Sequence, residues 1–231
     1  MHDGKRIVLD PRLSMIARLA GRCERFADIG CDHGRLGAFM LQTDRCRRAV
    51  LADISEPSLG KARRLIGLLG LSERVDFRVG DGLLALDAPV DAVAIAGMGG
   101  PTIAGILRAG RAKLGSARIV LQPNVGAREL RQALSGIEYR ITDERVVQDG
   151  RRNYVVMLAE PGASEYDERQ LTVGPVLLQR LPDELAPYAR FRLRVATQAL
   201  AGARAGGDEA QVEALCAEIG IWEEVSACLR R

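Results

Sequence analysis

The sequence predicts an α/β protein in which a doubly wound, mainly parallel sheet is followed by a small helical unit. From residue 26 to about residue 160, short strand-like runs alternate with longer helical patterns, as in sheets whose strands are joined by crossover helices. Beyond residue 175 the strand pattern ends and two long helical patterns remain. The 231 residues are 47% apolar and 27% charged, which is enough for one sizeable core and an appended small unit.

Seven strands are expected in the first part of the chain. The first five are nearly continuous apolar runs, of the kind that is buried on both faces of a parallel sheet. Only ten residues separate the last two, too few for a helical crossover, so these two should form an antiparallel hairpin that turns at Asp149-Gly150. The expected strands are RFADI (25–29), AVLAD (49–53), RVDFRV (74–79), VDAVAIA (90–96), ARIVLQ (117–122), EYRIT (138–142) and NYVVMLA (153–159).

The helix expected after the second strand should pack on the sheet. Ser55 can cap its start, and Gly70 can close its end. Its apolar residues recur at helical spacing and form one stripe, made of Leu59, Ala62, Leu65, Ile66 and Leu69.

The chain after the sheet is expected to form a helical hairpin. Residues 160–175 have the proline, glycine and serine content of a connector, so we place the domain that contains the sheet at 1–160 and a helical, coiled-coil-like domain at 161–231. Two helices should break at Gly206-Gly207, with Asp208 as the cap of the second. That helix carries an apolar seam for one partner helix, made of Val212, Leu215, Ile219, Trp222, Val225 and Leu229.

Composition excludes several classes of protein. No apolar run approaches the roughly 20 residues that cross a bilayer, and the N-terminus lacks a signal-peptide pattern, so a cytoplasmic protein without membrane contact is expected. Five cysteines without CxxC spacing and two histidines predict reduced thiols and no metal site. The net charge of +3 does not identify a nucleic-acid binder. Arginine clusters could nevertheless form a basic patch, although each one alone is typical of a solvated surface; they lie at 45–48, 61–64, 108–113, 150–152 and 190–194.

The loops after the strands carry the candidate functional residues, because ligands of open α/β sheets bind beyond the carboxyl ends of the strands. Asp53 ends the second strand. A carboxylate at this place can accept hydrogen bonds from both hydroxyls of a ribose, in NAD and in S-adenosylmethionine alike. An acid at a strand end can also simply cap the next helix, so Asp53 alone does not identify the ligand.

The loop after the first strand favours S-adenosylmethionine. It reads Gly30-x-Asp32-x-Gly34 and not the GxGxxG of dinucleotide-binding proteins. A carboxylate in this loop would repel a pyrophosphate by about 4 kcal/mol at about 4 Å, and it would attract a sulfonium. Asp28 and Asp81 join Asp32 and Asp53 around the expected pocket, which therefore suits a cation.

Six motifs in this order resemble the TrmK family of bacterial methyltransferases, which methylate N1 of adenine 22 in tRNA. They are LDPRLSMIARLA (9–20), ADIGCDHGRLG (27–37), GDGL (80–83), IAGMGGPTIAGIL (95–107), LQPN (121–124) and YVV (154–156). The likeness runs from about residue 9 through the C-terminal helical pair. It implies a class I, Rossmann-like methyltransferase domain with a seven-stranded sheet and a small helical domain, S-adenosyl-L-methionine as cofactor and tRNA as partner.

On these motifs we predict the site. Adenine N1 lies on the pairing edge, so the nucleotide must be extruded before the reaction. Asp32, and secondly Asn124, are the candidate catalytic residues, because an oxygen near the base stabilises the positive charge that methylation creates. Substrate contacts are expected from Arg12, Pro123, Arg190 and Arg194. Cofactor contacts are expected from Asp28, Gly30, Cys31, His33, Asp53, Ile54, Gly80, Asp81, Gly82, Ala96, Gly97, Met98, Gly99 and Gln122.

Simpler roles for these residues stay open at this point. Asp32 could cap the following helix, residues 97–100 could form only a tight turn, and residues 122–124 could be a loop with an asparagine cap. His33 could be structural or could touch substrate. Trp222 is more typical of a helix-pair core than of a base-stacking platform.

Two other functions also stay open. The chain could methylate another RNA site, a small molecule or a protein, or it could be a non-catalytic RNA-binding protein with a relict cofactor fold. Four carboxylates around one cavity disfavour the non-catalytic alternative.

Overall fold

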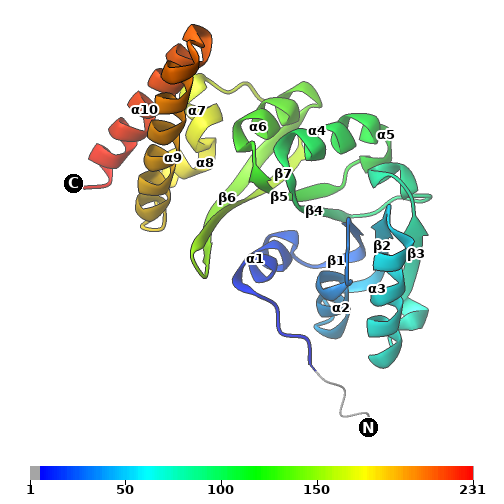
Figure 1. Cartoon of the computed structure of the whole chain (residues 1–231). Helices are drawn as coiled ribbons and strands as arrows, with labels where there is room; N and C mark the ends of the chain where they lie inside the picture. The colour runs from blue at the N-terminus through cyan, green and yellow to red at the C-terminus, as the bar shows by residue number, and fades with distance from the viewer. Residues whose placement is uncertain (1–5, 231) are drawn as a thin grey trace. The chain divides into compact units, whose positions relative to one another are not determined.

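Residues 6–230 are described by the structure, a computed structural model, and they fall into two units that divide between Glu165 and Tyr166 (Figure 1). The expected boundary at 160/161 lies close to this division. That the two parts are separate domains stays a prediction.

The first unit is built on a seven-stranded sheet with the order β3-β2-β1-β4-β5-β7-β6. Pairing is parallel from β3 through β5, whereas β7 is antiparallel to both of its neighbours. The seven predicted strands and the antiparallel end of the sheet are confirmed. The strands are β1 (Cys23–Ile29), β2 (Cys46–Asp53), β3 (Val75–Val79), β4 (Ala92–Gly99), β5 (Arg118–Val125), β6 (Tyr139–Asp149) and β7 (Arg152–Pro161).

Helices cover both faces of this sheet. Figure 1 shows α1 (Pro11–Ala20), α2 (Arg35–Gln42) and α3 (Glu56–Leu68) on one face. The opposite face carries α4 (Gly100–Ala109), α5 (Arg111–Leu114) and α6 (Ala127–Gly136), and the short 3-10 turns η1 (Ser72–Arg74) and η2 (Gly82–Ala85) precede β3 and β4. No helix within residues 6–230 is long and apolar enough to span a membrane.

The predicted packing of α3 is confirmed. The Ser55 hydroxyl accepts a hydrogen bond from the Ser58 N–H at 3.3 Å, as an N-cap does. Leu59, Ala62 and Ile66 are fully buried, because their spacing directs them to the sheet.

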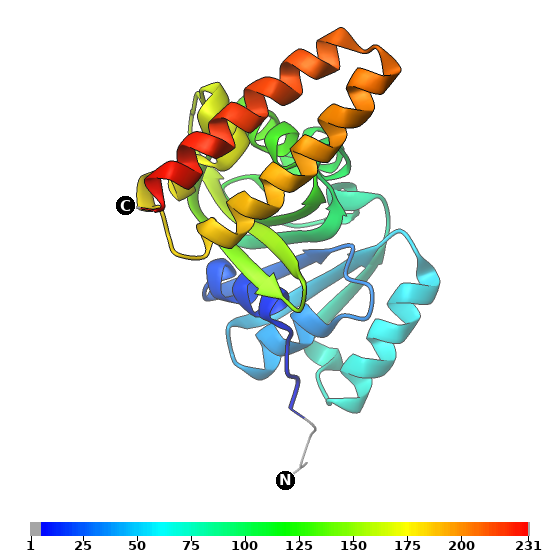
Figure 2. The same ribbon diagram turned by 60° about the vertical axis from the view of Figure 1, so that its left-hand side comes forward.

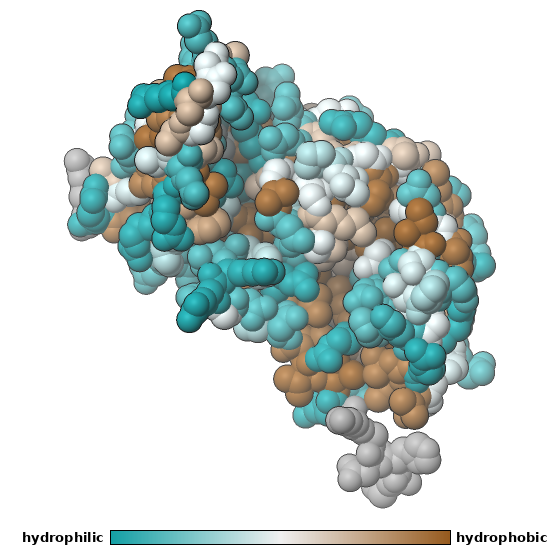
Figure 3. All heavy atoms as spheres, viewed as in Figure 1, coloured by the Kyte–Doolittle hydropathy of each residue, from teal (hydrophilic) through white to brown (hydrophobic). Residues whose placement is uncertain are grey.

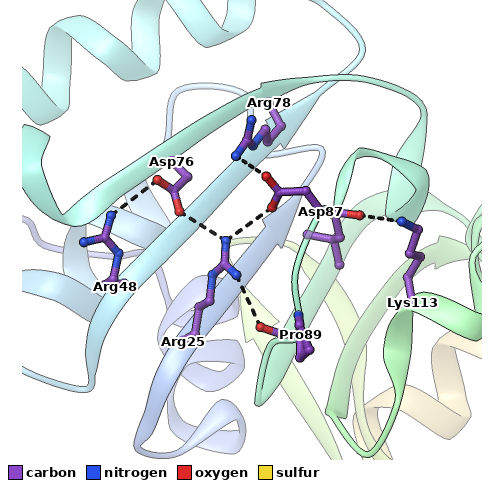
Figure 4. A network of polar contacts seen from close by, with 8 residues as sticks. Arg25, Arg48, Asp76, Arg78, Asp87, Pro89 and Lys113 are labelled. Atoms are coloured by element: carbon purple, nitrogen blue, oxygen red, sulfur yellow. Dashed lines mark hydrogen bonds and ion pairs between the residues drawn. The ribbon is translucent and has the colours of Figure 1, made fainter.

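A network of arginines and carboxylates covers the face of β1, β2 and β3 that lies opposite α1, α2 and α3 (Figure 4). Arg25 bridges Asp76 at 3.1 Å and Asp87 at 3.5 Å. Arg48 also pairs with Asp76, at 3.4 Å, and Arg78 pairs with Asp87. These ion pairs therefore link β1, β2 and β3 to one another and to the loop that follows η2.

A buried ion pair joins α6 to β6. Arg131 Nε donates to Glu144 Oε1 at 2.9 Å, and the two side chains are only 1% and 0% exposed. This pair could not be predicted from the sequence, because charged residues are most often exposed and nothing in the local pattern marks these two.

The second unit is helical throughout. It comprises α7 (Glu168–Val173), α8 (Pro175–Arg180), α9 (Leu185–Gly206) and α10 (Glu209–Cys228), and Figure 2 shows α9 and α10 as a long antiparallel pair. The helical hairpin and the Asp208 cap are confirmed. The prediction of a plain connector over 160–175 was wrong from residue 168, since Asp167 and Gln170 form a capping box that starts α7.

Trp222 belongs to the core between α9 and α10. Its side chain is fully buried and lies edge-on to Tyr188, with 5.7 Å between the ring centroids. Its indole N–H donates to Glu218 at 3.2 Å. This confirms that Trp222 packs the helix pair and is not available for stacking on a base.

Candidate active site

A cavity of about 530 Å³ opens at the carboxyl ends of β1, β2, β3 and β4. Its size is that of sites for cofactors and other small molecules. Among the residues predicted to bind or react, those that line it are Arg12, Asp28, Gly30, Cys31, Asp32, His33, Asp53, Ile54, Gly80, Asp81, Gly82, Ala96, Gly97 and Met98.

The remaining predicted residues lie outside the cavity lining. Gly99 is the last residue of β4. Three others lie near the end of β5, namely Gln122, Pro123 and Asn124, and two belong to α9, namely Arg190 and Arg194. Sequence reasoning missed several residues that do line the cavity, namely Leu13, Ile29, Arg35, Leu36, Ala52, Thr102 and Ile106. All of them except Ala52 lie within the motifs quoted above, so the motifs marked the right segments but not every position that lines the cavity.

The loop after β1 is held open by left-handed backbone conformations. Gly30 has φ +73°, and a Cβ at this position would lie 2.2 Å from the Met98 methyl carbon. Asp32 also has positive φ, +47°, which is uncommon for a residue other than glycine. Strained residues of this kind concentrate at functional sites, and here they turn the chain around the cavity.

Asp53 ties the first two loops together. One carboxylate oxygen accepts the Asp32 N–H at 3.1 Å, and the other accepts the Ser55 N–H at 2.9 Å. An ionised carboxylate has about four acceptor sites, so Asp53 keeps acceptor capacity toward a ligand while it fixes the backbone of Asp32.

The Asp32 side chain does not cap α2. The helix cap is Gly34, which has no side-chain cap hydrogen bond, so the simpler role considered for Asp32 is not seen. Its carboxylate instead lies 2.5 Å from His33 Nδ1, and the two side chains are 64% and 52% exposed. Asp32 therefore presents an oriented carboxylate at the rim of the cavity.

Burial gives Asp28 an unusual affinity for protons. It is the penultimate residue of β1, is 7% exposed and has a pKa raised to about 7. Burial is the main cause and the charge of Asp53 adds to it, whereas a hydrogen bond from the Gly37 backbone and the charge of Arg12 lower the pKa. Burial also raises the pKa of the Cys31 thiol, so this cysteine stays protonated and is no nucleophile.

A second network holds the ends of β4 and β5 together. Gln122 is fully buried, and its carbonyl oxygen accepts from Arg12 Nη1 at 2.7 Å and from the Gly97 N–H at 3.1 Å. Its amide nitrogen donates to Asn124 Oδ1 at 3.1 Å, and Asn124 Nδ2 donates to the Gly97 carbonyl at 2.7 Å. Residues 122–124 lie within β5, which ends at Val125, and do not form the loop with an asparagine cap considered above.

The cavity is negatively charged. Asp28, Asp32, Asp53 and Asp81 line it, against the two guanidinium groups of Arg12 and Arg35. Within residues 6–230, no cluster of histidine, cysteine or acidic side chains could hold a metal ion. The arrangement therefore fits an organic cation with ribose hydroxyls better than a pyrophosphate.

The comparisons with known proteins agree with this geometry. A family model described as "Methyltransferase domain" matches residues 9–157. The tRNA (adenine(22)-N(1))-methyltransferase of Bacillus subtilis is 35% identical over 170 residues, which are 72% of this chain and 71% of that protein.

Solved structures are similar to this chain over more of its length. The B. subtilis M1A22 tRNA methyltransferase TrmK is 27% identical with a TM-score of 0.86, over 95% of this chain and 99% of that one. A Streptococcus agalactiae protein described as a member of the NADB-Rossmann superfamily is 27% identical with a TM-score of 0.90, over 97% and 100%. These matches confirm the resemblance seen in the motifs: the chain belongs to the TrmK family of tRNA (adenine-22-N1)-methyltransferases.

Proposed function

We propose that this chain transfers a methyl group from S-adenosylmethionine to N1 of adenine 22 in tRNA, in the bacterial cytoplasm. The observation that carries the proposal is the cavity lined by four carboxylates at the carboxyl edge of the sheet, in a chain of the TrmK family.

The cavity residues fit the cofactor. S-adenosylmethionine supplies a methyl group on a sulfonium, and its positive charges suit the lining formed by Asp28, Asp32 and Asp81. The free acceptor sites of Asp53 suit the two ribose hydroxyls. Gly30 and Gly97 line the cavity, and their lack of side chains leaves room for a ligand beside the backbone.

The chemistry requires alignment more than activation, because adenine N1 already carries a lone pair. Asp32 is the group we propose to stabilise the positive charge that develops on the base. Its backbone is fixed by Asp53, and its carboxylate is fixed by His33. Both polar groups of the Asn124 amide are engaged with Gln122 and Gly97, so we assign Asn124 mainly to positioning the loop after β4.

The remaining predicted contacts concern the RNA. Arg190 and Arg194 are exposed on α9, and we propose that they bind phosphates of the tRNA. Pro123 is buried in β5 opposite Met98, and its contact with substrate stays a prediction.

The proposal is tested by incubating the protein with labelled S-adenosylmethionine and total bacterial tRNA, then digesting the RNA to nucleosides. Label in N1-methyladenosine is the expected result. Label in another nucleoside, or tRNA binding without any label, would favour one of the alternative functions and refute this one.

A matched variant tests the role of Asp32. Asp32→Asn keeps the size of the side chain and removes its charge, so turnover should fall by about two orders of magnitude with cofactor affinity little changed. Turnover equal to that of the wild type would remove Asp32 from the reaction.

A further inference from the structure

The tip of the hairpin between β6 and β7 lies at the same edge of the sheet as the cavity. Strand β7 is antiparallel to both β5 and β6, so the end of β6 and the start of β7 meet at the carboxyl edge of the parallel strands. Only Gly150 and Arg151 separate the two strands. Figures 1 and 2 both place this tip beside α1, the helix that carries Arg12.

Side chains connect the cavity to the hairpin tip. Arg12 lines the cavity, and its guanidinium lies 5.6 Å from the ring centroid of Tyr154 on β7. Arg152 precedes Tyr154 by two residues, so its side chain leaves the same face of the strand, roughly 7 Å further along. Val156, the next residue on this face, is fully buried in the core with α1. The order from the cavity outward is therefore Arg12, Tyr154, Arg152.

The arginines at the tip differ from those elsewhere on the sheet. Arg151 and Arg152 are exposed, and neither forms an ion pair with any side chain among residues 6–230, although Asp149 is the cross-strand partner of Arg152. Arg25 and Arg48, in contrast, are engaged with carboxylates (Figure 4). Hydrophilic side chains gather over the hairpin tip in Figure 3. The tip thus presents two guanidinium groups that have no ion-pair partner in the part of the chain that the structure describes.

We propose that this tip, defined as Arg151, Arg152 and Tyr154, is a surface that binds the sugar-phosphate backbone of RNA next to the extruded nucleotide. Guanidinium groups bind phosphates with two parallel hydrogen bonds. Guanidinium groups beside an aromatic ring form the combination that binds unpaired bases in RNA-binding proteins. A base that enters the cavity must leave its helix, and this surface holds the strand from which it comes. The inference rests on the proposed function, because it names where that function's substrate is held.

The test compares two double variants with the same loss of charge. Arg151→Ser with Arg152→Ser removes the tip arginines. Arg64→Ser with Arg108→Ser, on α3 and α4, is the control, since both residues are exposed and have no ion pair within the described chain. Affinity for tRNA is measured over a series of salt concentrations, and affinity for S-adenosylmethionine is measured by calorimetry.

The tip variant should bind tRNA roughly tenfold to a hundredfold more weakly. The slope of its log affinity against log salt concentration should be shallower by about 2, because each lost phosphate contact reduces this slope by about 1. Cofactor affinity should not change, which also shows that the variant is folded. The control should keep wild-type tRNA affinity.

Unchanged tRNA affinity in the tip variant, or an equal loss in both double variants, would overturn the inference even though the wild type methylates tRNA. Wild-type protein that binds tRNA without methylating it would refute the proposed function and leave the comparison of tip and control readable.

Discussion

Cofactor binding should strengthen as the pH rises from about 5.5 to about 7.5, because Asp28 ionises over this range. The buried carboxyl has a pKa raised from 3.8 to about 7. S-adenosylmethionine is a cation, so it gains the Asp28 carboxylate as a charged partner only when Asp28 is ionised. Below pH 7 the affinity should therefore fall by up to about tenfold for each further pH unit.

The stability of the free protein should change in the opposite direction. The unfolded chain has the ordinary pKa of 3.8, so between about pH 4 and about pH 7 the folded state binds more protons than the unfolded state. Stability is then lost as the pH rises through this window. The pKa is raised by about three, and a difference of one in pKa corresponds to about 1.4 kcal/mol, so this loss is at most about 4 kcal/mol.

Calorimetric titration with S-adenosylmethionine and urea unfolding without it, both at several pH values, measure the two effects. Asp28→Asn is the matched control, because it keeps the shape of the side chain and cannot ionise. It should flatten both pH profiles. A wild-type affinity that is constant over this range, or an equal slope in Asp28→Asn, would refute the role given to Asp28.

Three further changes have defined outcomes. Asp53→Ala should weaken S-adenosylmethionine by about 1.5–3 kcal/mol in calorimetry with the fold retained, and unchanged affinity would remove Asp53 from the ribose site. Gly30→Ala should lower cofactor affinity because its φ is +73°, whereas Gly60→Ala, at a helical position with open space, should bind normally; equal behaviour of the two would contradict the geometry. Glu144→Gln should lower the free energy of unfolding by about 3–5 kcal/mol in urea, because it removes the negative charge from the buried ion pair with Arg131; an unchanged urea midpoint would contradict this.

Structural features that follow from a local pattern could be predicted from the sequence, whereas features that depend on contacts between distant residues could not. The apolar runs of the strands and the capping residues Ser55 and Asp208 act locally, so their positions could be inferred. The hairpin at the end of the sheet was also expected, but the strands extend further than predicted and the turn is Gly150-Arg151. Cross-strand pairing with β7 supplies that extra length, and a local pattern does not reveal it.

The same distinction holds for the candidate site. The motifs identified the loops, because parallel strands bring their carboxyl ends to one edge. The amide network of Gln122 and Asn124 was not foreseen, since Arg12 and Gly97 reach it from elements far away in the sequence. The Asp28 pKa likewise depends on burial, which only the packed structure provides.

Methylation of one defined tRNA shows whether the chain acts on adenine 22. A transcript with adenine at position 22 is compared with the same transcript carrying guanine there, and methyl incorporation from labelled S-adenosylmethionine is measured for both. We expect incorporation into the adenine transcript, recovered as N1-methyladenosine at position 22, and none into the guanine transcript. Equal incorporation into both transcripts, or none into either, would contradict this expectation.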